Sequence, residues 1–156
     1  MNSHWLYKGK KVTEAPEDAF GFVYMITNLK SGKKYVGRKY LGQTRRKPLT
    51  KKQKDAGRKR RTVVRSESNW REYTGSNKEL NADIEKLSKE NFKFEIIIFG
   101  ETKGQVNYLE ENIHHKFDVL LDPSFYNDAV GPKRFNNMVK DEKLYKKIIE
   151  HLENRK

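Results

Sequence analysis

The carboxylate of Glu110 falls inside an apolar stripe, where a charge is costly. Six apolar residues around it recur at steps of three and four, as on one face of a helix: Val106, Leu109, Ile113, Phe117, Leu120 and Leu121. The neighbouring Glu111 falls toward solvent on the same helix. A divalent cation with a phosphate behind it would compensate a buried carboxylate at this position. An arginine from the sheet is the alternative partner.

Two histidines, His114 and His115, follow Glu110 by about one helical turn. The four-residue step from Glu110 to His114 would let both side chains reach one ion. Magnesium prefers oxygen ligands and keeps several waters, which makes a histidine ligand unusual for it. We therefore expect both histidines to lie at the surface.

Two tyrosines, Tyr24 and Tyr35, are predicted to lie on adjacent strands of a hairpin. Each stands in a short alternating fragment, and the turn between the fragments, residues 28–32, ends in Ser-Gly. In an isolated hairpin the two rings would pack and leave their hydroxyls at the surface. Beside a buried carboxylate and a cation, two phenols are also suited to phosphodiester chemistry.

The elements that must position these residues can be predicted from the apolar periodicity. Alternating or continuous apolar runs predict three strands of one sheet, the last of them central: residues 19–27, 33–39 and 92–99. Periods of three and four predict three helices: residues 77–88, 102–121 and 139–152. We expect Ser76 to cap the first helix, with Glu79 completing a capping box. No repeat or linker separates a second domain.

Composition limits the classes of protein to which the chain can belong. It has 156 residues, a formal net charge of +13 and a mean hydropathy of -1.01, which favour one modest domain with a polyanionic partner. The absence of cysteine excludes disulfides, thiolate zinc sites and cysteine nucleophiles. No apolar run has the length of a signal peptide or a membrane span. We therefore expect a soluble, cytoplasmic protein.

Most of the excess positive charge is concentrated in residues 45–65. Asp55 is the single acidic residue there, against eleven basic ones: Arg45, Arg46, Lys47, Lys51, Lys52, Lys54, Arg58, Lys59, Arg60, Arg61 and Arg65. We expect a flexible arm that becomes ordered along phosphates and dominates nonspecific binding. Lys39 is a further candidate contact. Trp70 could stack on bases or anchor the end of the arm to the core.

Several of these fragments resemble the GIY-YIG nuclease superfamily. Residues 22–24 (Phe-Val-Tyr) and 35–37 (Tyr-Val-Gly) are similar to its two signature tripeptides, although Phe22 stands where glycine is usual. Residues 70–76 with Leu80, and residues 91–97, are similar to the middle of its phage-borne homing endonucleases. The resemblance covers roughly residues 20–128. It implies an α+β fold in which helices flank a small three-stranded antiparallel sheet.

The resemblance also implies an activity. Nucleases of this kind hydrolyse phosphodiester bonds of double-stranded DNA with one metal ion, Mg²⁺ or Mn²⁺, held by a helical glutamate that matches Glu110, with Glu111 as the alternative. We expect a phage-type homing or genome-competition enzyme, monomeric or homodimeric, that nicks or cuts both strands. The nuclease domain would span residues 19–130, after a lead-in of residues 1–18 and before a C-terminal helical segment, residues 131–156. A noncatalytic DNA- or RNA-binding module on the same fold is the second hypothesis.

The remaining catalytic candidates follow from the same resemblance. Tyr24 or Tyr35 would help to activate water, which requires nearby positive charge because a free phenol has a pKa near ~10. The arginine that stabilises the phosphate is either Arg38, next to the second tripeptide, or Arg45, at the spacing usual in the family. Asn127 matches an asparagine that supports the active site, or it ends a turn after Pro123.

Overall fold

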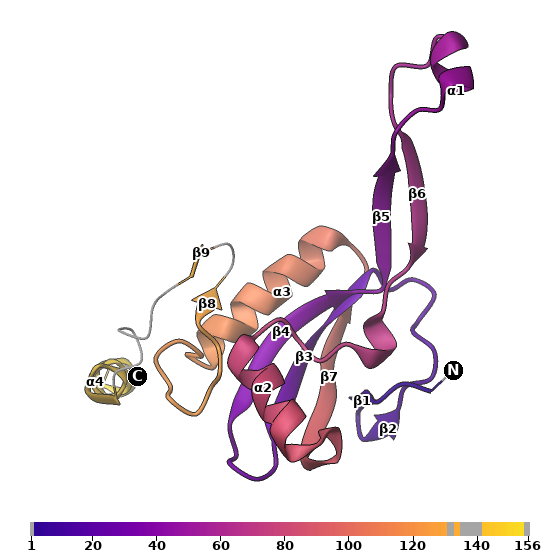
Figure 1. Cartoon of the computed structure of the whole chain (residues 1–156). Helices are drawn as coiled ribbons and strands as arrows, with labels where there is room; N and C mark the ends of the chain where they lie inside the picture. The colour runs from indigo at the N-terminus through magenta and orange to yellow at the C-terminus, as the bar shows by residue number, and fades with distance from the viewer. Residues whose placement is uncertain (1, 131–132, 135–141, 155–156) are drawn as a thin grey trace.

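The computed structural model describes residues 2–130, 133–134 and 142–154, which form a mixed α+β fold (Figure 1). Its main sheet has five strands in the order β2-β1-β7-β3-β4, so the expected number of three was too low. The two additional strands, β1 (Leu6–Tyr7) and β2 (Lys10–Lys11), come from the N-terminal lead-in. Two residues are too few to show an alternating pattern, which is why the sequence did not reveal them.

The three predicted strands pair with one another in antiparallel fashion. They are β3 (Gly21–Asn28), β4 (Lys34–Tyr40) and β7 (Phe92–Gly100), close to the expected bounds. Strand β3 pairs with both others, and β7 lies at the middle of the five. The β3–β7 register shifts after Val23, so that Tyr24 pairs with Ile96. Such bulges often redirect side chains beside functional sites.

One face of the sheet carries an aromatic core. Alternation along β3 directs Phe22, Tyr24 and Ile26 to this face. They pack with Trp5 from the lead-in and with Trp70, both essentially buried. Phe22, which departs from the signature tripeptide, has no exposed surface and meets both tryptophan rings edge-on. The departure is therefore a packing substitution in the core.

Helix α2 (Lys78–Leu87) packs against this aromatic core through Leu80. Its N-cap is Asn77, whose Oδ1 accepts a hydrogen bond from the Leu80 backbone N–H at 2.9 Å. The expected cap, Ser76, lies one residue too early and instead lies beside Tyr35. Two short 3₁₀ turns, η1 (Trp70–Glu72) and η2 (Lys89–Asn91), flank the helix in the chain.

The opposite face of the sheet is covered by α3 (Lys103–Lys116). Side chains from this helix and the segment after it pack on Val23 and Val36. The helix ends well before residue 121, because Asp118 adopts a left-handed conformation with φ of 47°. The chain then turns back and buries Val119 in the same core cluster. A left-handed aspartate leaves little trace in the sequence, unlike the glycine that commonly ends a helix.

The basic segment, for which the sequence predicted no regular structure, forms a hairpin. Strands β5 (Gly42–Lys47) and β6 (Thr62–Glu67) pair over six positions, and α1 (Lys51–Asp55) lies at the tip. Figure 1 shows this hairpin projecting away from the rest of the fold. We call residues 42–67 the arm and its two strands the ribbon.

The C-terminal part contains β8 (Ala129–Val130), β9 (Lys133–Arg134) and α4 (Glu142–Glu153). The helix expected over residues 139–152 corresponds to α4, although residues 139–141 lie outside the described part of the chain. No helix in the described ranges has the length and apolar character needed to cross a membrane.

Candidate active site

A cleft of about 760 Å³ contains most of the catalytic candidates. Residues from β3, β4, α3 and the segment before β8 line it, and they include Tyr24, Tyr35, Arg38, Glu110 and Asn127. The two tyrosines belong to the aromatic face of the sheet, whereas α3 lies on the opposite face. The cleft therefore gathers groups from both faces at β4, the edge strand. These five residues are separated by up to about a hundred positions in the chain.

Glycine at position 37 is required for the tyrosine pair. Gly37 pairs with Tyr24 across the two strands, and the two rings of Tyr24 and Tyr35 lie 6.1 Å apart, centroid to centroid. A Cβ at residue 37 would lie 2.5 Å from the Tyr24 hydroxyl oxygen and 3.0 Å from the Tyr35 ring. A Cβ atom does not approach other non-bonded atoms that closely, so any residue other than glycine would displace the phenols.

A third tyrosine, Tyr73, completes an aromatic cluster beside the cleft. Its ring meets that of Tyr24 edge-on at 6.2 Å. Gly75, two residues after Tyr73, has φ of +87°, and a Cβ there would contact both Tyr24 and Tyr35. Asn81 fixes this loop by donating to the Gly75 carbonyl at 3.0 Å. Residues 70–76 carried the family resemblance, but nothing in their sequence singled out Tyr73 as a cleft residue.

Both phenols of the tyrosine pair favour their protonated form. Burial raises the pKa of Tyr24 well above its ordinary value, and the neighbouring Tyr35 and Tyr73 phenols and the Glu110 carboxylate add to the increase. Burial also raises the pKa of Tyr35, against a smaller opposing effect of its hydrogen bond with Ser76. At neutral pH both hydroxyls are therefore protonated and able to donate hydrogen bonds.

Glu110 is buried in the cleft wall and forms an ion pair with Arg38 on β4. Its side chain is 8% exposed, whereas that of Arg38 is 36% exposed. The pairing with an arginine of the sheet, one of the two explanations for a buried carboxylate, is thus present. It does not seal the site, because both side chains line the open cleft. Glu111 is exposed and does not line it.

Arg38 is held in place by two hydrogen bonds, one of which is extended to α3 through Tyr40. Besides its bond to Glu110, its Nε donates to the Tyr40 hydroxyl at 3.2 Å, and that hydroxyl donates to Asn107 on α3. Burial opposes the charge on Arg38, but Glu110 and Tyr40 outweigh it, so the arginine pKa is raised. Arg45, the alternative arginine, is exposed on β5 of the arm and does not line the cleft.

Asn127 is buried and fixes the edge of β4 beside the tyrosine pair. Its Oδ1 accepts from the Val36 N–H at 3.0 Å, and its Nδ2 donates to the Val36 carbonyl at 2.8 Å. At Val36, between Tyr35 and Gly37, this side chain thus makes the two backbone hydrogen bonds that a neighbouring strand would make. This geometry positions the strand and is more than a turn ending after Pro123.

His114 is buried, contrary to the surface position expected for it. Its Nε2 lies 2.8 Å from the same Val36 carbonyl, so this nitrogen carries the proton and donates. The other ring nitrogen, Nδ1, is buried without a hydrogen-bond partner within the described structure. Helix α3 buries positions 106, 110 and 114, whereas Phe117 is 44% exposed. His114 lies four residues after Glu110 and shares its buried face, so the expectation based on the ligand preference of magnesium was wrong for it; His115 is exposed as expected.

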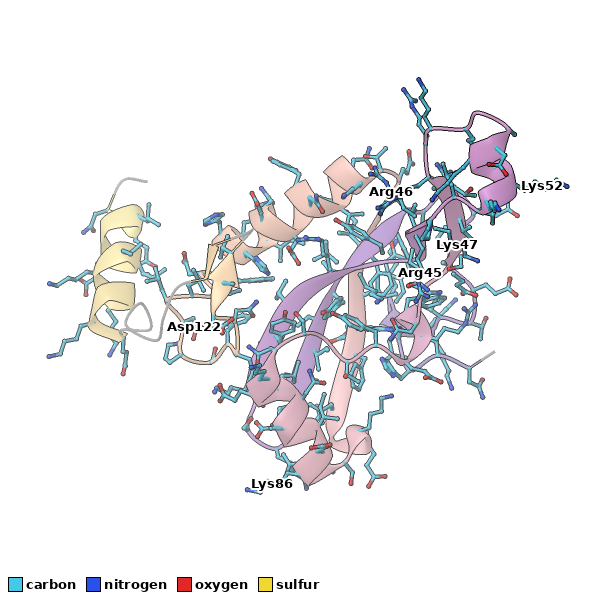
Figure 2. The ribbon with its side chains drawn as sticks, turned by 45° about the horizontal axis from the view of Figure 1, so that its top comes forward. Arg45, Arg46, Lys47, Lys52, Lys86 and Asp122 are labelled. Atoms are coloured by element: carbon cyan, nitrogen blue, oxygen red, sulfur yellow. The ribbon has the colours of Figure 1, made fainter. Side chains whose placement is uncertain are left out.

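The candidates for nucleic-acid binding fall into two groups. Trp70 is 1% exposed and donates from Nε1 to Glu67, so it anchors the arm and does not stack on bases. Lys39 lies over the Tyr73 ring at 4.0 Å and donates to Asn69, and burial lowers its pKa. The others are exposed on the arm; Figure 2 shows Arg45, Arg46 and Lys47 along it, with Lys52 at its tip.

The donor set of the cleft fits a hard cation. Within the described ranges no three His, Cys, Asp or Glu side chains are grouped as a metal site. Three carboxylates line the cleft, those of Glu79, Glu110 and Asp128, and Glu110 is the buried one. Magnesium is commonly held by one or two carboxylates, waters and substrate phosphates, without a dedicated protein cage. A single buried carboxylate at an open cleft is compatible with that mode.

Comparison with protein families gives one result. A family model described as "Putative endonuclease segE, GIY-YIG domain" matches residues 5–138. No curated protein and no solved structure gives a significant match. The matched range includes the five-stranded sheet, the arm and every candidate residue of the cleft, and it extends the resemblance into the N-terminal strands.

Proposed function

The chain belongs to the segE-type GIY-YIG endonuclease family, and on that premise we propose that it is a metal-dependent endonuclease of double-stranded DNA. Membership implies nuclease activity; the cation, the reaction at this cleft and a homing or genome-competition role are the proposal. The observation that carries it is the convergence of two phenols, an arginine and a buried carboxylate on one open cleft. A noncatalytic module would have no need to keep all four around open space.

Arg38 is the arginine that we assign to the phosphate. Its guanidinium is about one-third exposed and is already oriented by Glu110 and Tyr40. A guanidinium donates in a fixed fork that matches phosphate oxygens, so a prealigned arginine stabilises the charge that develops during hydrolysis. Arg45 takes no part in this step, because it lies on the arm.

Tyr24 and Tyr35 are assigned to orienting the attacking water and the phosphate. Their raised pKa values keep both hydroxyls protonated, which supports donation of hydrogen bonds. The packing against Gly37 holds the two rings in one arrangement. Precise orientation of the reacting groups is a large source of rate enhancement, even without proton removal by the same side chain.

Glu110 is assigned to holding the cation, Mg²⁺ or Mn²⁺. When bound, the ion supplies positive charge to the phosphate and to the leaving 3′ oxygen. Asn127 and His114 act indirectly, because both form hydrogen bonds with Val36, which lies between Tyr35 and Gly37. They keep β4 in register with the carboxylate on α3.

Cleavage of supercoiled plasmid tests this proposal. We expect relaxation or linearisation with Mg²⁺ and none with EDTA. Glu110→Gln should lower the rate by at least ~10³-fold, since it removes the charge that would hold the cation. Glu111→Gln is the matched control, because it changes the adjacent exposed carboxylate, and it should cleave like the unmodified protein.

Two results would count against the proposal. Equal cleavage by the Glu110→Gln variant and the unmodified protein would remove Glu110 from the reaction. DNA binding without cleavage under Mg²⁺ or Mn²⁺, across plasmid and phage DNA, would favour the noncatalytic module.

A further inference from the structure

The ribbon is not held in shape by the core. All six residues of β5 are exposed, and in β6 only Thr62 and Val64 are half-buried. Neither strand contributes to the two core clusters. A two-stranded hairpin without a buried face is only marginally stable in water. Packing against the core therefore does not explain the regular pairing over six positions, which points to a role other than stabilising the fold.

The cations of the arm are available to a partner. Among the described residues, none of the eleven basic side chains between positions 45 and 65 forms an ion pair or a side-chain hydrogen bond. Arg38, in contrast, is already engaged by Glu110. Charge complementarity with a polyanion is the interaction that this arrangement leaves open.

One face of the ribbon is more open than the other. The register pairs Thr44 with Arg65 and Arg46 with Val63, and alternation directs these four side chains to one face. All four are exposed, and Val63 is 52% exposed. On the opposite face two of the three β6 residues, Thr62 and Val64, are half-buried. The open face thus combines two guanidinium groups with two methyl-bearing side chains. At the base of the ribbon the same face carries Glu67, whose carboxylate is engaged by Trp70 and Arg71.

This combination matches the edges of base pairs in the major groove. Arginine donates two hydrogen bonds to guanine O6 and N7, and methyl groups of threonine or valine contact the methyl of thymine. The major groove, about 12 Å wide, admits a two-stranded ribbon and presents a distinct pattern for each base pair, whereas the minor groove, about 6 Å wide, presents a degenerate one. Phosphate binding alone would not require an exposed valine between the arginines.

We infer that the face formed by Thr44, Arg46, Val63 and Arg65 enters the major groove of double-stranded DNA and reads base edges. Arg46 and Arg65 contact guanines, and the basic residues of the tip contact the flanking phosphates. This inference rests on the proposed function in that the DNA is the substrate of the cleft. Because the two arginines are offset by two residues on adjacent strands, their guanines lie within about four base pairs of each other.

Selection from a random 30-base-pair duplex pool, with the full chain in EDTA, tests the inference. Sequencing of the bound fraction should show a motif with two guanines at the stated spacing. Arg46→Lys with Arg65→Lys keeps the charge but removes the guanidinium fork, so it should abolish the motif while binding to the unselected pool falls less than ~3-fold. Arg58→Lys with Arg60→Lys, in the tip loop, is the matched control and should keep the motif.

Methylation of guanine N7 gives a second, independent readout. Dimethyl sulfate treatment of the selected duplex should reduce binding by roughly 5- to 150-fold, as expected for a lost bidentate contact. The inference is overturned by the absence of a motif, by a motif that survives the Arg46→Lys, Arg65→Lys change, or by binding that methylation does not affect. Plasmid cleavage with Mg²⁺ is scored separately, so a failed ribbon with active cleavage leaves the proposed function intact.

Discussion

Two arginines seven positions apart, Arg38 and Arg45, show how differently the cleft and the arm use positive charge. Arg38 pairs with Glu110, bonds to Tyr40 and is about two-thirds buried at its side chain. Arg45 is exposed on a ribbon whose cations make no ion pairs in the described structure. In the cleft one positive charge is thus held in a fixed position, whereas the arm carries many positive charges whose side chains have no fixed partners in the described structure.

This contrast implies that catalysis and affinity are separable in the molecule. Changes in the cleft should lower the cleavage rate and leave DNA binding nearly unchanged, because few cleft groups are free to add long-range attraction. Changes in the arm should weaken binding and its salt dependence, and leave the rate at saturating DNA unchanged. The following changes test that separation.

Of these further changes, Gly37→Ala should have the largest effect, because the new Cβ would overlap the Tyr24 hydroxyl. We expect the plasmid cleavage rate to fall by ~10²–10³-fold, as when an oriented catalytic donor is lost. DNA affinity, measured by fluorescence anisotropy, should change less than ~3-fold. Gly42→Ala at the base of the arm is the control, since a Cβ there has only an ordinary contact at 3.6 Å. Normal cleavage by Gly37→Ala would remove the tyrosine pair from the reaction.

Removing three cations from the arm should have the next largest effect, on binding alone. Changing Lys59, Arg60 and Arg61 to Gln should reduce the slope of log K against log salt by about 3 units and the affinity at low salt by ~10²-fold. The control triple, Lys10, Lys11 and Lys86 to Gln, removes equal charge from exposed sites on the body. If both triples weaken binding equally, the net charge and not the arm provides the affinity.

Most of the fold could be predicted because its long elements carry strong periodicity. The strands near Tyr24, Tyr35 and Phe94 and the helices after Asn77 and Thr102 all appear close to the expected places. The exceptions have local physical causes. Strands of two residues show no alternation, and a left-handed Asp118 gives no signal like that of glycine. The ribbon was missed because its charges hide the pairing of two short strands.

The sequence predicts a residue of the cleft only where a single hairpin or helix determines the position of that residue. Tyr24, Tyr35 and Glu110 follow from a hairpin and a helical stripe, and they do meet in one cleft. The choice between Arg38 and Arg45 depends on where β4 ends and the arm begins, which no pattern marks. His114 was misplaced because the expectation rested on the ligand preference of magnesium, whereas its actual partner is the carbonyl of Val36 on a distant strand, which no local pattern reveals.

Asn127→Ala should destabilise the cleft more than any single change on the arm. It removes both hydrogen bonds to Val36 and leaves the buried backbone N–H and C=O of that residue without this partner. We expect a loss of about 2–3 kcal/mol in the free energy of unfolding, measured in urea. Asn69→Ala, which removes one exposed bond to Lys39, should cost less than ~0.5 kcal/mol. Equal costs would mean that β4 does not need this support.

Lowering the pH should have the smallest effect, and it should act on the cleft and not on the arm. His4 bonds to the Tyr73 carbonyl at 3.0 Å, behind the tyrosine cluster, and burial followed by repulsion from Lys89 lowers its pKa from 6.5 to about 4. Since the unfolded chain then binds more protons between these values, stability is complete above pH 6.5 and declines as the pH falls toward 4.

The decline attributable to His4 should be about 1–2 kcal/mol, discounted because the ring is partly exposed to solvent. Urea unfolding at pH 7 and pH 4.5 should show it for the unmodified chain and show less of it for His4→Gln, which keeps an amide donor for Tyr73. The arm lacks histidine and takes no part in this transition. DNA binding at low salt should therefore weaken less than cleavage over the same pH range, whereas a parallel loss of both would mean that the arm depends on the cleft for its structure.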